Sequence, residues 1–226
     1  PPSSCQGNRS IRLQGPGGTA GALADVEPGA SVNSLSARVT CDAQPVSGKV
    51  VALTIDVVSF SGGHQHDQGR RPQHRGTVSF NGSDTTDANG DVFFTFTAPA
   101  PAGDHTITAR CSAGSCGTDT RNVWVGVQGL VSLYETHLYR LVGSDGVHPN
   151  NHYLTIGATG TVGWLAELYR ARFPNDPVLH LNDASLERGG LFDINYPARI
   201  QWWTPPHITH RRGIDVDVRA NEFVHA

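Results

Sequence analysis

Two histidines and two aspartates lie within eleven residues near the end of the chain, at His207, His210, Asp215 and Asp217. Imidazole nitrogen and carboxylate oxygen are the usual protein ligands of a divalent metal of the zinc type. Gly213 separates the histidines from the aspartates, and glycine allows the backbone to bend sharply. We therefore expect His210 to turn back toward Asp217, so that both side chains meet at one ion.

The segment after the glycine alternates between apolar and acidic residues, with Ile214, Val216 and Val218 as the apolar ones. This alternation predicts a strand with one apolar face and one acidic face. The glycine and the β-branched residues argue against the helical H-E-x-x-H zinc motif. A buried polar strand end that binds no metal is the alternative explanation of the same residues.

The spacing H-x-x-H-x-x-G-x-D-x-D, from His207 to Asp217, resembles the zinc-binding segment of the penicillin-insensitive murein endopeptidases. Those enzymes belong to a wider group of peptidoglycan peptidases that includes D-alanyl-D-alanine carboxypeptidases. The upstream stretch NDASLERGG (residues 182–190) looks like the segment that precedes the motif in the same enzymes. The resemblance covers residues 180–218 and implies that His210 and Asp217 bind zinc.

The resemblance also bears on the rest of the metal site. A catalytic zinc needs three protein ligands and an open position for water, whose pKa the metal lowers toward neutrality. In the group the third ligand is a histidine of a downstream H-x-H or E-x-x-H segment, which is not found after Asp217 here. The chain is then a fragment, or the site is incomplete, or another histidine substitutes. The candidates for the third ligand, in falling order, are His225, His207 and His152.

Other residues receive roles from the same resemblance. His207 would polarise the tetrahedral intermediate, and Asp215 would orient an imidazole. The implied substrate is a peptide cross-link with D-amino acids in peptidoglycan. The residues expected to line its cleft are Asp183, Ser185, Trp202 and Trp203. Adjacent tryptophans also pack in cores, which is the alternative for that pair.

The composition limits the class of protein. A length of 226 residues fits one large domain or two ordinary ones. A formal charge of −3 gives no reason to expect nucleic-acid binding, and the sequence contains no apolar run long enough to span a membrane. No signal peptide is visible, and the start at Pro1 suggests a processed chain.

The four cysteines, Cys5, Cys41, Cys111 and Cys116, suggest disulfides and an oxidising compartment. Cys41 and Cys111 share strand parity with core positions, which favours a bridge between two sheets. The rival pairing joins Cys111 to Cys116 across a short loop and leaves Cys5 for Cys41. We slightly prefer the rival, because it avoids an awkward pairing between Cys5 and a hairpin tip.

Short alternating segments bounded by turn residues fill the first half of the chain and predict a β-sandwich over residues 1–128. The expected strands are Ser10–Leu13, Leu23–Val26, Leu35–Cys41, Val50–Val58, Gly76–Phe80, Val92–Thr97, Asp104–Cys111 and Thr118–Val127. The Asn89-Gly90 pair predicts a turn, since glycine supplies the positive φ angle that such turns need.

The stretch from Gly76 to Cys111, with its TDANG turn and AGDHTITA ending, looks like a bacterial immunoglobulin-like repeat of the invasin type. Such domains are spacers or adhesion modules, so the resemblance implies an immunoglobulin-like fold in a secreted, cell-surface or periplasmic protein. A long loop of this domain holds His64, His66 and His74. These histidines would bind a metal, complete the next domain's site or contact an anionic partner; a solvated loop is the alternative.

Residues 129–226 differ in character and predict a small α+β domain. One helix is expected over Thr161–Phe173, with strands at Leu138–Val142 and Val178–Leu181. The helix carries an apolar stripe that we expect to face the core. Its members are Val162, Leu165, Leu168, Tyr169 and Phe173.

Two functions from different classes fit these observations. The first is a secreted, Zn²⁺-dependent peptidase-like protein that acts on or binds peptidoglycan peptides. The second is a secreted structural or adhesive surface protein that self-assembles through exposed strand edges and carries an incomplete peptidase-like module. The eleven histidines suggest a third, metal storage, but their scatter over several loops argues against one dedicated site.

Overall fold

The structure is a computed structural model that describes residues 7–59, 75–112, 116–144, 150–191 and 209–219. The chain divides into two compact units. The first comprises the described residues up to Ser59 and those within Gly69–Pro99 and Gly103–Val125; the second comprises Ala100–Ala102 and the described residues from Gly126 onward. Together they are mainly β, with a β-sandwich in the first unit and a small α+β arrangement in the second, as the sequence predicts.

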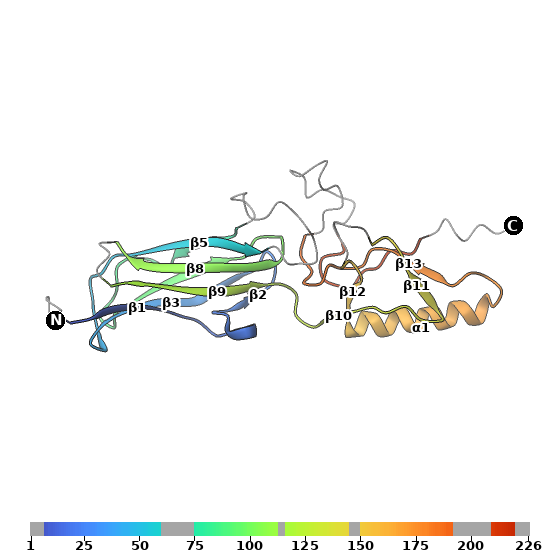
Figure 1. Cartoon of the computed structure of the whole chain (residues 1–226), viewed down its shortest axis with the longest axis horizontal. Coiled ribbons are helices and arrows are strands. Elements are labelled where there is room, and N and C mark those ends of the chain that lie inside the picture. The colour runs from blue at the N-terminus through green and yellow to red at the C-terminus, as the bar shows by residue number, and fades with distance from the viewer. Residues whose placement is uncertain (1–6, 60–74, 113–115, 145–149, 192–208, 220–226) are drawn as a thin grey trace, which may run out of the picture. The chain divides into compact units, whose positions relative to one another are not determined.

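The first unit consists of two sheets (Figure 1). One sheet has the strand order β1-β3-β7-β6, and β4 also pairs with β3. Its strands are β1 (Arg9–Gln14), β3 (Ser31–Cys41), β4 (Gln44–Pro45), β6 (Thr77–Phe80) and β7 (Asp91–Thr97). The other sheet has the order β2-β9-β8-β5. Its strands are β2 (Asp25–Val26), β5 (Val51–Ser59), β8 (Gly103–Cys111) and β9 (Thr118–Val125). A 3₁₀ turn, Thr19–Gly21, precedes β2.

The two sheets enclose one core, because alternate residues of each strand point inward. Along β8 every second residue is buried. Phe94 and Phe96 of β7 and Ile107 of β8 have no exposed surface. Burial of each such side chain contributes about 1.5–3 kcal/mol, so this alternation is what stabilises the sandwich. One polar ring, His105, is also fully buried, with its ring centroid 6.0 Å from that of Phe96.

The predicted Asn-Gly turn connects the loop before β7 to that strand. The Asp87 carboxylate accepts hydrogen bonds from the backbone N–H groups of Asn89 and Asp91, at 2.8 and 2.9 Å. Gly90 has φ = 76°, in the left-handed region that glycine tolerates. Arg38 of β3 then donates from Nε to the Asp91 carboxylate at 2.8 Å, which fixes the start of β7 against its neighbour.

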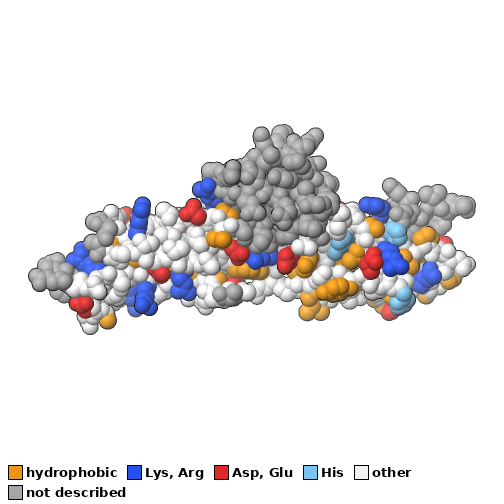
Figure 2. Space-filling model, in the orientation of Figure 1, with side chains coloured by type: hydrophobic (Ala, Val, Ile, Leu, Met, Phe, Trp, Pro, Cys, Tyr) orange, Lys and Arg blue, Asp and Glu red, His pale blue; other side chains and the backbone are white. Residues whose placement is uncertain are grey.

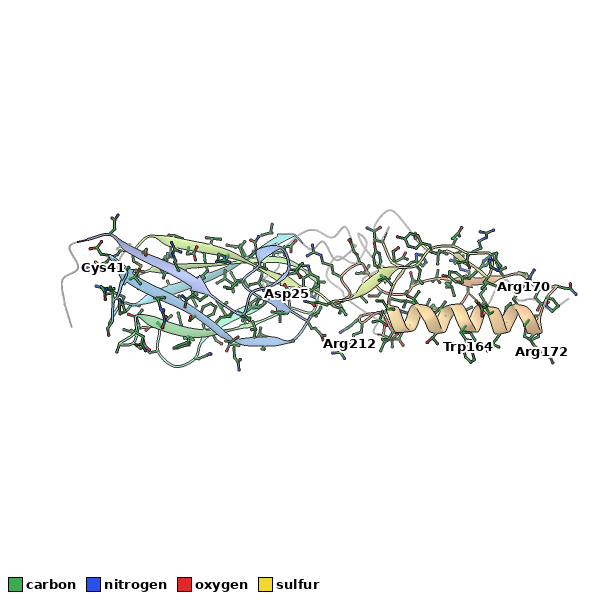
Figure 3. All side chains as sticks on the ribbon, turned by 90° about the horizontal axis from the view of Figure 1, so that it is seen from below. Asp25, Cys41, Trp164, Arg170, Arg172 and Arg212 are labelled. Carbon is green, nitrogen blue, oxygen red and sulfur yellow. A yellow bond between two sulfur atoms is a disulfide. The ribbon has the colours of Figure 1, made fainter. Side chains whose placement is uncertain are left out.

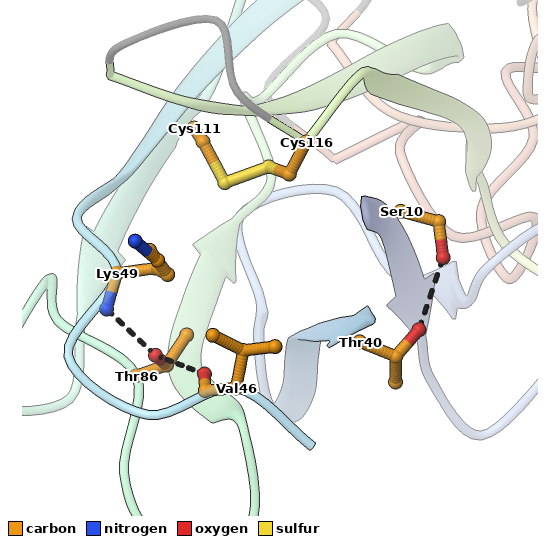
Figure 4. The surroundings of a disulfide bond; sticks show 7 residues. All are labelled: Ser10, Thr40, Val46, Lys49, Thr86, Cys111 and Cys116. Atoms are coloured by element: carbon orange, nitrogen blue, oxygen red, sulfur yellow. Dashed lines mark hydrogen bonds between the residues drawn. A yellow bond between two sulfur atoms is a disulfide. The ribbon is translucent and has the colours of Figure 1, made fainter. Parts of the chain in front are cut away.

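A disulfide joins Cys111, the last residue of β8, to Cys116, just before β9 (Figure 4). Both cysteines are buried, and their Cα atoms lie 5.6 Å apart. The predicted pairing across the short loop is therefore confirmed. The alternative bridge from Cys111 to the other sheet is wrong, because the pairing of β8 with β9 places Cys116 next to Cys111. Cys41 is also disulfide-bonded. Cys5 lies outside the described residues.

In the part of the second unit that the structure describes, one helix lies beside two small sheets (Figure 1). β10 (Leu130–Ser132) pairs antiparallel with β12 (Tyr153–Thr155), and β11 (Tyr139–Leu141) pairs parallel with β13 (Leu179–Leu181). Its core is small and includes Leu133, Tyr139, Leu154, Val162, Ala166, Leu179, Leu181 and Ala184. No helix among the described residues is long and apolar enough to cross a membrane.

The helix α1 (Ile156–Arg172) begins five residues earlier than the sequence predicts. Thr155 caps it, because its hydroxyl oxygen accepts a hydrogen bond from the Ala158 backbone N–H at 3.2 Å. The first half of the helix contains three glycines, which have low helix propensity, so the sequence does not indicate that the helix begins there.

The predicted apolar stripe of α1 is wrong in part. Val162 is buried, but Leu165 and Leu168 are about half exposed, and the buried partner of Val162 is Ala166. Apolar residues surround the helix on both sides, so their spacing alone does not show which side meets the core.

The predicted strand over residues 214–218 is not formed; the segment has no regular secondary structure apart from an isolated bridge between Val218 and Leu181. Ile214 and Val218 are exposed, while Val216 packs against the core. The expected apolar face is therefore only partly formed. The backbone of Gly213 bonds to Thr155, just before α1, whereas that of Asp217 bonds to Asn182 and Asp183, just after β13, so the segment does not follow one neighbouring strand along its length.

Candidate metal centre

The structure brings His210 and Asp217 together. The Nε2 atom of His210 lies 3.4 Å from Oδ1 of Asp217. His210 is 3% exposed, whereas the Asp217 side chain is 56% exposed. Two ligands bound to one tetrahedral zinc at 2.0–2.1 Å are about 3.3 Å apart, so the observed separation fits a shared ion with one side open to solvent.

Gly213 produces the turn that brings the two side chains together. Its φ angle is 68°, and a side chain there would collide with Leu130, with the Cα of Leu154 and the N of Thr155 only 3.2 Å from its Cβ. The Gly213 carbonyl accepts a hydrogen bond from the Thr155 N–H at 2.8 Å. The sharp bend expected from the sequence is present, and its position is fixed by the start of α1.

The backbone of Asp217 is held on both sides by the residues that follow β13. The Asp217 N–H donates to the Asp183 carbonyl at 2.8 Å, and the Asn182 N–H donates to the Asp217 carbonyl at 2.7 Å. These bonds leave the Asp217 carboxylate free to turn toward His210. The NDASLERGG stretch and the metal motif, which are far apart in the sequence, thus lie side by side.

Asp183 was expected to line a substrate cleft, but the structure places its carboxylate in a buried network. Oδ1 accepts from the side-chain amide of Asn151 and Oδ2 from that of Asn182, both at 2.8 Å. Ser185 is fully buried too, and its hydroxyl donates to the Leu186 carbonyl at 3.1 Å. In this structure both residues hold neighbouring chain segments rather than face solvent.

Asn151 is the residue of this network that no sequence pattern indicated. Its side-chain oxygen accepts from the Ser144 hydroxyl at 3.0 Å, and its amide also donates to the Gly143 carbonyl at 3.3 Å. Its own carbonyl accepts from the Ala184 N–H at 2.9 Å. The contact with Asp183 spans 32 residues of sequence, so no local pattern points to it.

His152, the third choice for the missing ligand, has both ring nitrogens engaged. Nε2 lies 2.9 Å from the Val142 carbonyl oxygen, which only accepts, so Nε2 carries the proton. Nδ1 lies 3.3 Å from the oxygen of the Ser144 hydroxyl, whose proton goes to Asn151. His152 therefore anchors its loop by hydrogen bonds.

Next to this network, Tyr153 of β12 forms a two-way backbone pair with Ser185. Burial raises the pKa of the Tyr153 hydroxyl above its usual value, and the nearby Glu187 raises it further. The tyrosine is therefore neutral at physiological pH and supplies no charge to the centre.

The remaining predicted residues are only partly described. Asp215 is half-buried, two residues before Asp217. The residues that lie outside the described ones are His207, Trp202, Trp203 and His225, together with His64, His66 and His74. Within the described ranges no group of three metal-binding side chains occurs. The donors present, one imidazole and one carboxylate at tetrahedral spacing, fit two of the three ligands of a zinc site.

No protein-family model and no curated protein matches the sequence. Among solved structures, the Yersinia pseudotuberculosis adhesin InvE is similar with a TM-score of 0.37 and 16% identity, over 55% of this chain and 34% of that one. Domains 5–6 of the S-layer protein SbsC give 0.35 and 14%, over 66% of this chain and 62% of that one. Domains 4–9 give 0.35 and 12%, over 66% and 20%. This chain thus spans about a third of the adhesin structure, and at these TM-scores no functional argument follows.

Proposed function

We propose that the second unit is a zinc-binding, peptidase-like module that acts on or binds peptidoglycan peptides, and that the first unit is a spacer for it. The observation that carries the proposal is the 3.4 Å separation of His210 Nε2 and Asp217 Oδ1 across the Gly213 turn. The resemblance of residues 180–218 to the murein endopeptidases gives the substrate class. A secreted or cell-surface bacterial location goes with that substrate and with the disulfide.

Each residue of the proposed zinc site has a separate role. His210 and Asp217 hold the ion, and Asn182 with Asp183 fixes the backbone of Asp217. A bound zinc supplies a Lewis acid and a water molecule of near-neutral pKa. His207 is assigned to the tetrahedral intermediate by the resemblance alone.

The test is the zinc content of purified chain 1–226, measured by elemental mass spectrometry. We expect about one zinc per chain in the parent and none in His210→Ala or Asp217→Asn. The control is His137→Ala, which alters an exposed histidine of the same unit. Zinc content that is equal in all four proteins, or absent from the parent, would overturn the metal assignment. Cleavage of peptidoglycan peptides is then assayed with the zinc-loaded chain.

A structural or adhesive surface protein is the second candidate. The observation that favours it is the disulfide-containing sandwich of the first unit, because the immunoglobulin-like repeats that residues 76–111 resemble are spacers or adhesion modules. In this case the chain carries no zinc, cleaves nothing, and still sediments with bacterial cell walls. Cleavage of a D-amino-acid cross-link that disappears in His210→Ala would exclude it.

A further inference from the structure

The outer face of α1 carries large apolar side chains that are exposed among the described residues of its unit. Ile156 is 72% exposed, Trp164 61% and Leu168 47%. Figure 3 shows Trp164 projecting away from the strands of its unit, and Figure 2 shows apolar side chains along the edge where α1 runs. Apolar side chains exposed over several turns of one helix make this face a candidate interaction site.

The uncovered residues form a row with a gap in it. Ile156, Gly160, Trp164 and Leu168 follow one another at intervals of four residues, and residues four apart lie one above the other on a helix. A Cβ atom built at Gly160 meets nothing within 4 Å. The row is therefore a ridge of apolar side chains interrupted by an empty notch at Gly160, directly beside the tryptophan.

We infer that this ridge is the contact between two copies of the chain, with their α1 helices antiparallel around a two-fold axis. Trp164 of one copy then enters the notch at Gly160 of the other, and symmetry makes the reverse contact. The same register sets Ile156 against Leu168 at both ends. A two-fold contact must be complementary to itself, and the order of large and small residues along this ridge meets that condition.

Charge also favours a second copy as the occupant. The four residues of the ridge carry no charge, and the exposed Glu167 beside them lies opposite Gly157 of the other copy in this register, so two copies meet without like-charge repulsion. Arg172, the next position of the row, lies beyond the contact, and its guanidinium stands 5.7 Å from the centre of the Phe173 ring. A partner recognised by charge would find no complementary group on this ridge.

The size of the surface sets the strength of the contact. The ridge and the neighbouring Leu165 offer roughly 400 Å² per copy, since a tryptophan side chain alone presents up to about 200 Å². A pair would bury about 800 Å², which is below the standard size of a stable interface. We therefore expect a reversible dimer with a dissociation constant on the order of tens of micromolar.

The experiment is sedimentation equilibrium of chain 1–226 between about 5 and 200 μM. The mass should rise with concentration toward twice the 24.1 kDa of the chain. Gly160→Trp fills the notch and Trp164→Gly removes the side chain that enters it, so each should weaken the dimer at least about tenfold. The double variant exchanges the two and should restore the parent affinity. Far-ultraviolet circular dichroism verifies that each variant is folded.

The matched control is Val58→Ser, which removes an equally exposed apolar side chain (59% exposed) from β5 of the sandwich. It should leave the dimer affinity unchanged. A mass of 24.1 kDa at every concentration would overturn the inference, as would a dimer that both single variants leave intact. If the double variant dimerises as weakly as the single variants, the proposed register of the two helices is wrong. The measurement does not depend on zinc, so it stands apart from the proposed function.

Discussion

Replacing Asn151 with alanine should destabilise the second unit and loosen the metal centre. The change removes the amide that donates to the buried Asp183 carboxylate at 2.8 Å. A hydrogen bond to a charged group is worth about 1.5–3 kcal/mol, and the lost bond from the Ser144 hydroxyl adds about 0.5–1.5 kcal/mol. Asn182 still donates to Asp183, so the carboxylate keeps one partner. We expect a loss of about 2–4 kcal/mol in the free energy of unfolding.

The loss is measured by differential scanning calorimetry. For a unit of this size, about 1 kcal/mol corresponds to 4–8 °C in Tm, so the transition of the second unit should fall by about 8–30 °C. The transition of the sandwich should not move, because Asn151 lies in the other unit. Two transitions are analysed separately, since a two-unit chain does not unfold in one step.

The neighbouring Asn150 provides the matched control, because it has the same chemistry but is exposed. Asn150→Ala should change the free energy of unfolding by no more than about 0.5 kcal/mol. If Asn151→Ala proves as mild as Asn150→Ala, the network around Asp183 does not hold the unit together. If the chain binds zinc, Asn151→Ala should also lower the zinc affinity about 10–100-fold, as the loss of groups that orient metal ligands does. An unchanged zinc affinity would mean that the network around Asp183 does not position Asp217.

Three further outcomes follow from the structure. Replacing Cys111 and Cys116 with alanine should lower the stability of the sandwich by about 2 kcal/mol in urea unfolding, because the unfolded loop regains its freedom; an unchanged midpoint would contradict this. Asp119→Ala removes the acceptor of the Leu13 N–H at 2.7 Å, which ties β1 to the other sheet, so hydrogen exchange at Leu13 should accelerate, and the variant should lose about 1–3 kcal/mol. Raising the pH above about 10 should destabilise the second unit first. Burial raises the pKa of Tyr139, so the unfolded chain releases the phenolic proton at lower pH than the folded one, and stability falls as pH rises. All five tyrosines lie in the second unit, so a calorimetric scan in which the sandwich transition falls first would refute this order.

The sandwich could be predicted from the sequence because its signal is local. Strands repeat every two residues, and the alternation along β8 sets which side chains are buried without knowledge of the partner strand. The Asn89-Gly90 turn and the Gly213 bend are equally local, since each depends on a φ angle that glycine supplies. His210 and Asp217 are separated by only that bend, so their meeting follows from the same few residues.

Only the tertiary structure decided the rest. The burial of Asp183 depends on Asn151, which is distant in the chain, so a residue expected in a cleft lies instead inside the unit. The exposed ridge of α1 has the same cause: apolar residues occur on both sides of the helix, and only its packing against β10 and β12 shows that Val162 is inside and Trp164 outside. Local backbone preference and periodicity are properties of short segments, whereas burial is a property of the whole unit.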